Sequence, residues 1–269
     1  PFYRTLLYNV FPSHITIQLT GQYTMYIPTG ELHVILTEID GILNSCRSSE
    51  TTDTSPSPGT DLVTLAQALE QLADVMTRVE GDITSGGNTT SADISEIGAY
   101  ALQLQEALAA ACEKQSLSEQ QHPLALLATN IALWIAQHGG QIEALEPVAN
   151  AIALIANKSR DPSDLGKLSG VISTIIAAVS PVISQDLEKM NPGRPWRVLL
   201  LNHSIVATRS HDTNLMETAF ELLTSRLPED ATRFFSEGME QMDALDYPAQ
   251  VRAVMEKYHS QWPVNRSLH

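Results

Sequence analysis

Residues 123–157 read PLALLATNIALWIAQHGGQIEALEPVANAIALIAN, and this stretch decides the fold class. The first block is apolar over most of its length, and in the second block Ile142, Leu145, Ile152 and Ile155 recur at helical spacing, which is typical of packed helices. Gly139-Gly140 lies between the blocks, and glycine commonly ends a helix. The sequence therefore predicts a helix over 124–137 and a second helix over 141–157.

The alternation of helix and breaker continues on both sides of this stretch. Pro181 is expected to kink or split a helix over 163–189, because proline removes a backbone hydrogen bond from a helix interior. The remaining helices are predicted over 32–43, 61–79, 93–112, 196–208, 214–226, 229–242 and 248–261. We therefore predict an all-α protein whose helical hairpins stack as an α-solenoid-like or irregular helical array.

Three segments are expected to interrupt the helices. Residues 14–27 alternate apolar and polar side chains around Gly21-Gln22, which favours a short N-terminal β-hairpin. Residues 45–60 are rich in Ser, Thr and Pro and predict a linker, and residues 81–91 predict a second loop. Asp93 and Glu96 have capping-box-like spacing, which would begin the helix there.

The charge of the chain is unevenly distributed. There are 16 Lys and Arg against 31 Asp and Glu, a net charge of −15. Residues 1–190 carry −13 of this and residues 191–269 carry −2. We predict an irregular N-terminal region over 1–60, an acidic helical region over 61–190 and a hairpin region over 191–269. We do not expect the protein to bind nucleic acid independently of sequence, because such binding requires clustered Lys and Arg residues.

The hairpin region contains a weak internal repeat. An offset of 35 positions aligns Leu199-Leu200 with Phe234-Phe235 and Pro228 with Pro263. This pattern of helix, turn, helix and terminal proline over residues 196–263 resembles tetratricopeptide-like helical hairpin repeats. Trp196 would stand near the tryptophan of that family, although the Leu-Gly and Tyr that follow it there are missing here. The resemblance implies a groove that binds a peptide or protein segment.

Residues that could carry chemistry are scattered. The eight histidines form no H-E-x-x-H motif, and Cys46 and Cys112 have no partner nearby in sequence, so we predict no metal and no cofactor. Cys112 is expected to be buried, whereas Cys46, at the start of the segment rich in Ser, Thr and Pro, is a candidate for an exposed thiol. Carboxylate pairs occur at Glu143/Glu146 and at Asp243/Asp246, a spacing that is usual on a solvated helix face.

One constellation suggests a different function. His211-Asp212, in a helical chain, resembles the centre of the HD phosphohydrolases, which bind divalent metal through His, His-Asp and Asp. The resemblance implies His138 or His203 as the first ligand and Asp243 or Asp246 as the last. The competing interpretation is that Asp212 or Thr213 caps the helix that begins there. A metal-dependent phosphohydrolase that uses His211 and Asp212 is therefore our alternative hypothesis.

Two sets of side chains suggest partner binding instead. Phe234, Phe235, Met239 and Met242 form one stripe, which predicts either core packing or a groove for a partner segment. Arg197 and Arg209 belong to a basic cluster that would either contact an acidic partner or pair with nearby glutamates. These six residues are our predicted partner-binding site.

We therefore expect a non-enzymatic scaffold or adaptor protein that binds a protein or peptide partner through a helical groove. No segment has the length and apolarity of a membrane span, and no secretory signal is recognised, so we expect a cytoplasmic location. The oligomeric state and the identity of the partner are left open.

Overall fold

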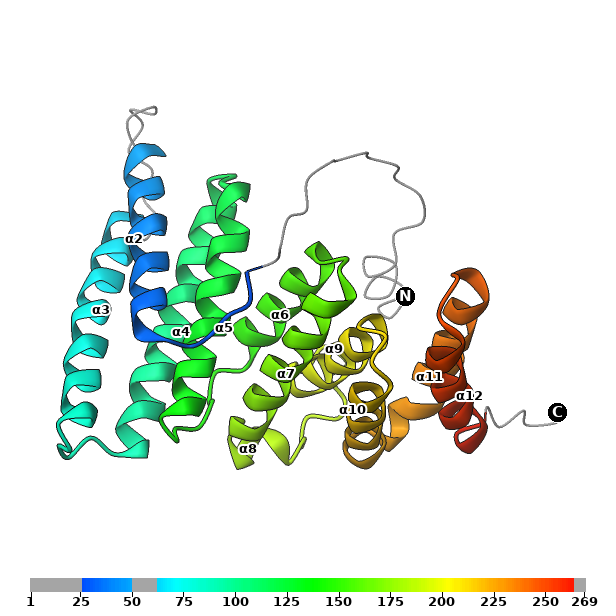
Figure 1. Cartoon of the computed structure of the whole chain (residues 1–269). Coiled ribbons are helices and arrows are strands. Elements are labelled where there is room, and N and C mark those ends of the chain that lie inside the picture. Colours follow the sequence, from blue (N-terminus) through cyan, green and yellow to red (C-terminus); the bar gives the residue numbers. More distant parts are fainter. Residues whose placement is uncertain (1–25, 50–61, 264–269) are drawn as a thin grey trace.

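The computed structural model describes residues 26–49 and 62–263, and these residues form an elongated arrangement of helices (Figure 1). The described residues contain 11 α-helices and no strand, which confirms the all-α prediction. The hairpin predicted over 14–27 lies outside the described residues, except for its last two positions. None of the described helices combines the length and the apolarity that crossing a bilayer would require.

The first four helices form a bundle. These are α2 (Leu32–Ser49), α3 (Leu62–Thr84), α4 (Ser91–Lys114) and α5 (Gln121–Gln137). Each helix packs against the next, and α5 also packs against α2, so the four form a closed ring around one apolar interior. The bundle is the group of long helices at the left of Figure 1.

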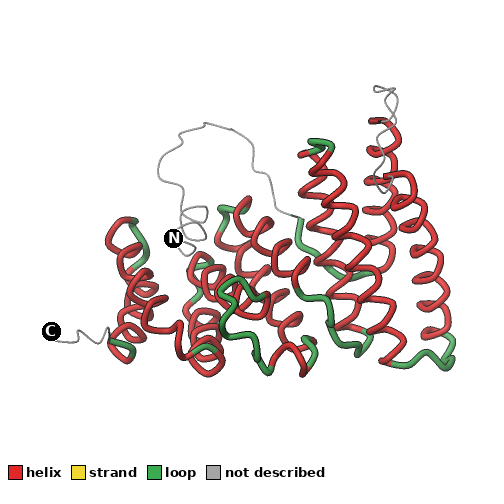
Figure 2. The backbone as a smooth tube through the Cα atoms, turned by 180° about the vertical axis from the view of Figure 1, so that it is seen from behind, coloured by secondary structure: helices red, strands yellow, loops and turns green. Residues whose placement is uncertain are grey.

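The remaining helices extend away from one side of the bundle. Figure 2, seen from behind, shows them as shorter segments joined by brief loops. They are α6 (Glu146–Lys158), α7 (Pro162–Ala178), α8 (Pro181–Ser184), α9 (Pro195–Arg209), α10 (Thr213–Arg226), α11 (Pro228–Ala244) and α12 (Ala249–Gln261). The pairs α9–α10 and α11–α12 each pack as a helical hairpin.

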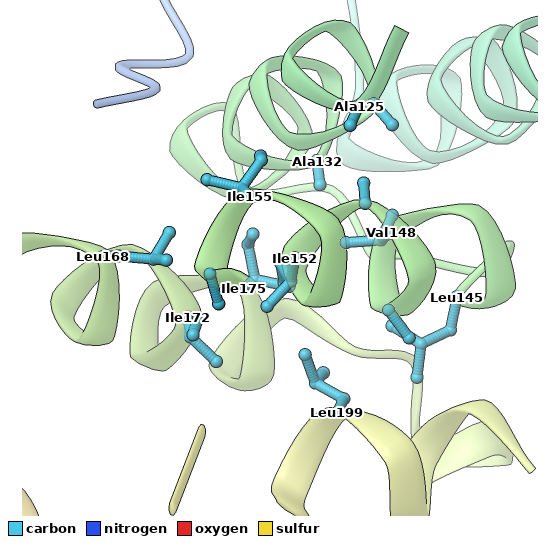
Figure 3. Packing of buried hydrophobic residues seen from close by; sticks show 14 of the residues in the cluster. Ala125, Ala132, Leu145, Val148, Ile152, Ile155, Leu168, Ile172, Ile175 and Leu199 are labelled. Atoms are coloured by element: carbon cyan, nitrogen blue, oxygen red, sulfur yellow. The ribbon is translucent and has the colours of Figure 1, made fainter. Parts of the chain in front are cut away.

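Helix α6 joins the bundle to the rest of the chain. Its Ile152 and Ile155 are fully buried, and α6 packs against α5, α7 and α9. Figure 3 shows the apolar side chains of α6 lying between those of α5, such as Ala132, those of α7, such as Ile172, and Leu199 of α9. Burial of these side chains holds the two parts of the molecule together, and each fully buried Val, Leu or Ile contributes about 1.5–3 kcal/mol.

Several predicted boundaries were wrong because polar composition alone does not end a helix. Helix α2 continues through Ser49 instead of ending before residue 45, and α3 continues to Thr84. Neither extension contains proline, and α3 ends only where Gly86 adopts a positive φ of 72°. The cap of α4 is also displaced, because Thr90 with Asp93, not Asp93 with Glu96, forms the capping box.

Two predicted helices begin late or end early. Residues 141–145 are not helical, because Pro147 favours the first turn of a helix and α6 therefore begins at Glu146. Pro181 splits the helix predicted over 163–189, as expected. However, the second piece, α8, ends at Ser184, and residues 185–194 form a loop.

Candidate functional site

A depression with a volume of about 670 Å³ lies beside the first half of α4. One wall is α4, and the opposite wall is the linker that joins α5 to α6. The lining residues are Ser91, Ala92, Ser95, Glu96, Ala99, Tyr100, Gln103, Gly139, Gln141 and Glu143. Most of these side chains are polar or acidic, so the depression suits a polar ligand better than an apolar one.

The wall formed by α4 is fixed at its start by a capping box. The Oγ1 atom of Thr90 accepts a hydrogen bond of 3.2 Å from the backbone of Asp93, and the Asp93 carboxylate accepts one of 2.8 Å from the backbone of Thr90. These bonds satisfy backbone groups that a helix start leaves without partners. The lining residues on the first turn of α4 are therefore held in a defined position.

The linker is held on two sides. Ser95 donates a hydrogen bond to the carbonyl of Ser91 and accepts one of 2.8 Å from the backbone of Gln141. One residue later, the N–H of Ile142 bonds to the carbonyl of Ala178 at 2.8 Å, at the end of α7. The depression is therefore formed by ordered backbone.

Two glycines allow the walls to come close. A Cβ atom on Gly98 would overlap the side chain of Ile135, and one on Gly140 would lie 2.7 Å from Ile94. A larger residue at either position would therefore require the neighbouring core side chains to move. The glycines thus let α4, α5 and the linker pack closely enough to enclose the depression.

Four carboxylates make this surface acidic. Glu96 and Glu143 line the depression, and Glu106, further along α4, lies near Glu146 at the start of α6. Burial first, and then the nearby Glu146 carboxylate, raise the pKa of Glu106. In the described part of the chain, no Lys or Arg forms an ion pair with any of the four. The negative charge is therefore not neutralised within this region.

Tyr100 adds an exposed aromatic ring to the acidic surface. Its exposed fraction is 53%, which is high for a large side chain on a packed helix. Glu96 is four residues earlier and Gln103 three residues later, so the three side chains share one face of α4. A tyrosine ring attracts cations through its face. Ring, carboxylates and amides together could bind a guanidinium or ammonium group.

The predicted aromatic and methionine stripe lies elsewhere and faces inward. Phe234, Phe235 and Met242 are buried, and Met239 is half-buried. The Phe235 ring lies 5.1 Å from that of Phe220, in an edge-to-face contact between α11 and α10. Of the two interpretations of the stripe, these positions favour core packing.

The two predicted arginines are occupied within the chain. Arg197 is buried and forms a two-bond ion pair with Asp230, and Arg209 donates to the carbonyls of Ala156 and Ser159 at the end of α6. Burial is the main cause that lowers the pKa of Arg209. Both guanidinium groups therefore join helices of this chain to one another.

The residues implied by the HD resemblance take part in local contacts. Asp212 caps α10 by accepting bonds from Asn214 and Leu215, and the His211 ring packs edge-on against Tyr247. His203 is buried with its Nε2 3.1 Å from Ser173 Oγ. Among the described residues, no group of three or more His, Cys, Asp or Glu side chains is placed to hold a metal ion. These contacts favour the capping interpretation of Asp212.

The cysteines differ from expectation in one respect. Both Cys46 and Cys112 are buried, so Cys46 is not the exposed thiol that its position in the sequence suggested. The neighbouring Cys46 first, and burial second, raise the pKa of the Cys112 thiol. The two thiols therefore lie close together although they are distant in sequence. A raised pKa makes a thiol a poor nucleophile at neutral pH.

Sequence reasoning named Glu143 and Glu146 as a carboxylate pair and Glu96 only as part of a helix cap, and it did not identify Tyr100 or Gln141. The available signal was a lone tyrosine on the polar side of a helix rich in alanine. Comparison with protein-family models, curated proteins and solved structures found no match to this chain. The depression itself is thus the basis for assigning a function.

Proposed function

We propose that this protein is a non-enzymatic interaction protein, a scaffold or adaptor, and that it binds a basic segment of a partner protein in the depression beside α4. The single observation that carries the proposal is the set of carboxylates around Tyr100 that have no cationic partner in the described chain. The cytoplasmic location expected from the sequence remains part of the proposal.

Electrostatics supports a cationic ligand. Glu96 and Glu143 face the depression from opposite walls, so a cationic side chain placed between them would be attracted by both. Pairs of this kind at a surface contribute little individually, about 0–1 kcal/mol each. A useful affinity therefore requires several contacts along one segment, which suits a peptide with more than one Arg or Lys.

The other lining residues could form hydrogen bonds with the backbone of a bound peptide. Gln103 and Gln141 provide amide donors and acceptors, and Ser91 provides a hydroxyl. Because the linker and the start of α4 are held by hydrogen bonds, the protein would lose little conformational entropy on binding. Tyr100 would then lie against an Arg or Lys side chain of the bound segment.

The proposal is tested by fluorescence anisotropy with a labelled peptide in which arginine alternates with glycine and serine. We expect binding that weakens as salt is raised, because exposed charge pairs are screened. Tyr100→Ala should weaken it about two- to fivefold, and Glu96→Gln with Glu143→Gln should weaken it further. Glu240→Gln, an exposed change on α11, is the matched control.

The same peptide with glutamate in place of arginine should not bind. Equal binding of the two peptides, or equal losses for Glu240→Gln and for the depression variants, would contradict the proposal. The depression variants alter exposed side chains, so a circular dichroism spectrum identical to that of the unchanged protein is the condition for interpreting them.

A further inference from the structure

A short non-helical segment crosses the bundle before α2 begins. Residues 26–31 form this segment, which we call the strap, and Figure 1 shows it in dark blue, leading to the start of α2. The Oδ1 atom of Asn130 on α5 accepts hydrogen bonds of 2.9 Å from the backbone of Thr29 and from the backbone of Gly30. Gln137, further along α5, donates one of 2.6 Å to the carbonyl of Thr29. The strap is therefore attached to α5 by hydrogen bonds.

The strap lies directly on α5. Gly30 adopts a positive φ of 76°, and a Cβ atom at this position would lie 2.6 Å from the Cβ atom of Leu133. Glycine fits both requirements, because it has no side chain and adopts a positive φ freely. Asn130, to which the strap is bonded, is fully buried. Movement of the strap away from α5 would therefore expose Asn130 to water.

A carboxyl group of α2 is bonded to the same asparagine. The Nδ2 atom of Asn130 donates a hydrogen bond of 2.9 Å to Oε1 of Glu38. The other oxygen of Glu38, Oε2, is buried and has no hydrogen-bond partner among the described residues. A buried carboxylate with an unsatisfied oxygen is disfavoured far more than a neutral carboxyl group is. Burial accordingly raises the pKa of Glu38 to about 7.

No positive charge offsets an ionised Glu38. In the described part of the chain, no Lys, Arg or His forms an ion pair with this residue. The titratable groups of the strap are Tyr26 and Glu31, and neither can become positive. Burial first, and then Glu38, raise the pKa of Tyr26, so Tyr26 lies within electrostatic range of the carboxyl group.

The helices around Glu38 supply no cation that faces it either. Helix α2 packs against α3 and α5. The groups described on these helices that can be positive have other partners: His33 contacts Glu31, Arg78 donates to the carbonyl of Asp74, His138 contacts Glu80, and His122 interacts with Lys158. The other titratable side chains described there cannot become positive, and they are Asp40, Cys46, Glu70, Asp74, Glu80 and Asp82.

We propose that the strap is a pH-sensitive element, which lies closed on α5 while Glu38 is protonated and opens when Glu38 ionises. An ionised Glu38 requires water or a hydrogen-bond donor at Oε2, and opening of the strap admits water to Asn130 and to the carboxylate bonded to it. The proton that Glu38 loses passes to the solvent.

The strap is the part of this hydrogen-bonded cluster that moves most easily. Hydrogen bonds to two side chains of α5 attach it, whereas α2 is packed into the bundle through buried apolar residues such as Ile35 and Ile39. Neither Glu38, Asn130 nor any residue of the strap lines the depression beside α4, so the inference does not rest on the proposed function.

The first test is amide hydrogen exchange of the full chain by NMR at pH 6 and pH 8, corrected for the intrinsic pH dependence of exchange. Protection of the Thr29 and Gly30 amides should fall about tenfold between these pH values, as expected for a carboxyl group whose pKa is about 7 in the closed state and 4.5 in the open state. The amide of Thr89, which bonds to the Asp82 carboxylate in another loop, is the matched control and should keep its protection. Equal protection of Thr29 and Gly30 at both pH values, or an equal fall for Thr89, would overturn the inference.

Low concentrations of urea distinguish opening of the strap from unfolding of the whole protein. Exchange through the open strap should be insensitive to urea, because little surface is exposed, whereas exchange through global unfolding accelerates as urea is added. A urea dependence as steep for Gly30 as for Ile131, a fully buried residue of α5, would contradict a local opening.

The second test uses substitutions in both directions. Glu38→Gln keeps the bond with Asn130 without a charge, so Thr29 and Gly30 should be equally protected at pH 6 and pH 8. Asp40→Asn, an exposed change on the same helix, is its control and should retain the fall. In Gly30→Ala the strap can no longer lie on Leu133, so the pKa of Glu38, followed through its carboxyl carbon, should fall from about 7 toward 4.5. A fall in protection that persists in Glu38→Gln, or a Glu38 pKa that stays near 7 in Gly30→Ala, would show that the strap and the carboxyl group are not coupled.

Discussion

The guanidinium of Arg197 donates two hydrogen bonds of 2.7 Å to the carboxylate of Asp230. Both side chains are almost removed from solvent, with exposed fractions of 4% and 11%. The pair joins α9 to the first turn of α11, where the helix dipole also favours a carboxylate. This arginine, predicted as a contact for a partner, is thus a connection between two helical hairpins.

Arg197→Met should destabilise the protein by about 3–5 kcal/mol, because it leaves the Asp230 carboxylate buried without its partner. Urea unfolding followed by circular dichroism measures this directly. Arg233→Ala is the control, because its pair with Glu237 is half-exposed and should contribute only about 0–1 kcal/mol. Equal losses for the two variants would show that the buried pair has no special role.

Phe235→Ala should destabilise the protein by about 3–5 kcal/mol. The side chain is fully buried among the rings of Phe220, Phe234 and Tyr258, and its removal would leave a cavity. Thermal or urea unfolding provides the measurement. A loss below about 1 kcal/mol, the typical cost of an average substitution, would instead favour the interpretation of this stripe as a binding surface.

Glu38 should make the protein less stable as pH rises toward neutrality. Burial raises the pKa of Glu38 to about 7 from 4.5, although a bond from Asn130 opposes the shift. The folded state therefore holds a proton that the unfolded chain has released. The stability that this group contributes is fully present below pH 4.5 and is lost as pH rises through 7.

Glu38→Gln should remove this dependence and stabilise the protein at pH 8, because the amide keeps the bond with Asn130 without a charge. Unfolding free energies at several pH values provide the test. A variant that is less stable than the unchanged protein at pH 8 would show that the ionised carboxylate is favourable at this site.

His203 should make the protein less stable as pH falls below 6.5. Burial lowers the pKa of His203 to about 4 from 6.5. As pH falls, His203 is therefore protonated at a higher pH in the unfolded chain than in the folded protein. The stability from neutral His203 is fully present above pH 6.5 and is lost as pH falls through 4. In His203→Gln, the loss of stability between pH 6.5 and 4 should be smaller, measured by the same unfolding series. If the unfolding free energy of the variant fell with pH as steeply as that of the unchanged protein, His203 would not be the source of the pH dependence.

The fold class was predictable because apolar residues recur at helical spacing in amphipathic helices such as α3 and α11, and because the more buried α5 is apolar over most of its length and is followed by glycine. Gly139 and Pro181 were also identified correctly as breaks, since both act through local backbone geometry. The boundaries at residues 45 and 81 were predicted wrongly, because polar side chains are tolerated in exposed helix ends. The boundary at residue 141 was also predicted wrongly, because the position of Pro147 decides where α6 begins. Division of the chain near residue 190 stays a prediction, although α7 and α9 pack together across it.

The site was less predictable than the fold. Whether Phe235 and Arg197 face solvent depends on how α9–α10 packs against α11–α12, which no local pattern specifies. Tyr100 and Glu143 are more than forty positions apart, and only the packing of the linker against α4 brings them to one depression. The missing information in both cases is the tertiary contact.

The most direct test of basic-segment binding is a titration of the isotope-labelled protein with the arginine-containing peptide, followed by backbone amide NMR. We predict that the largest shift changes fall on residues 91–103 and 139–143, and that they vanish in Tyr100→Ala combined with Glu96→Gln and Glu143→Gln. Shift changes centred on another surface, or unaffected by these substitutions, would contradict the proposal that the depression beside α4 is the binding site.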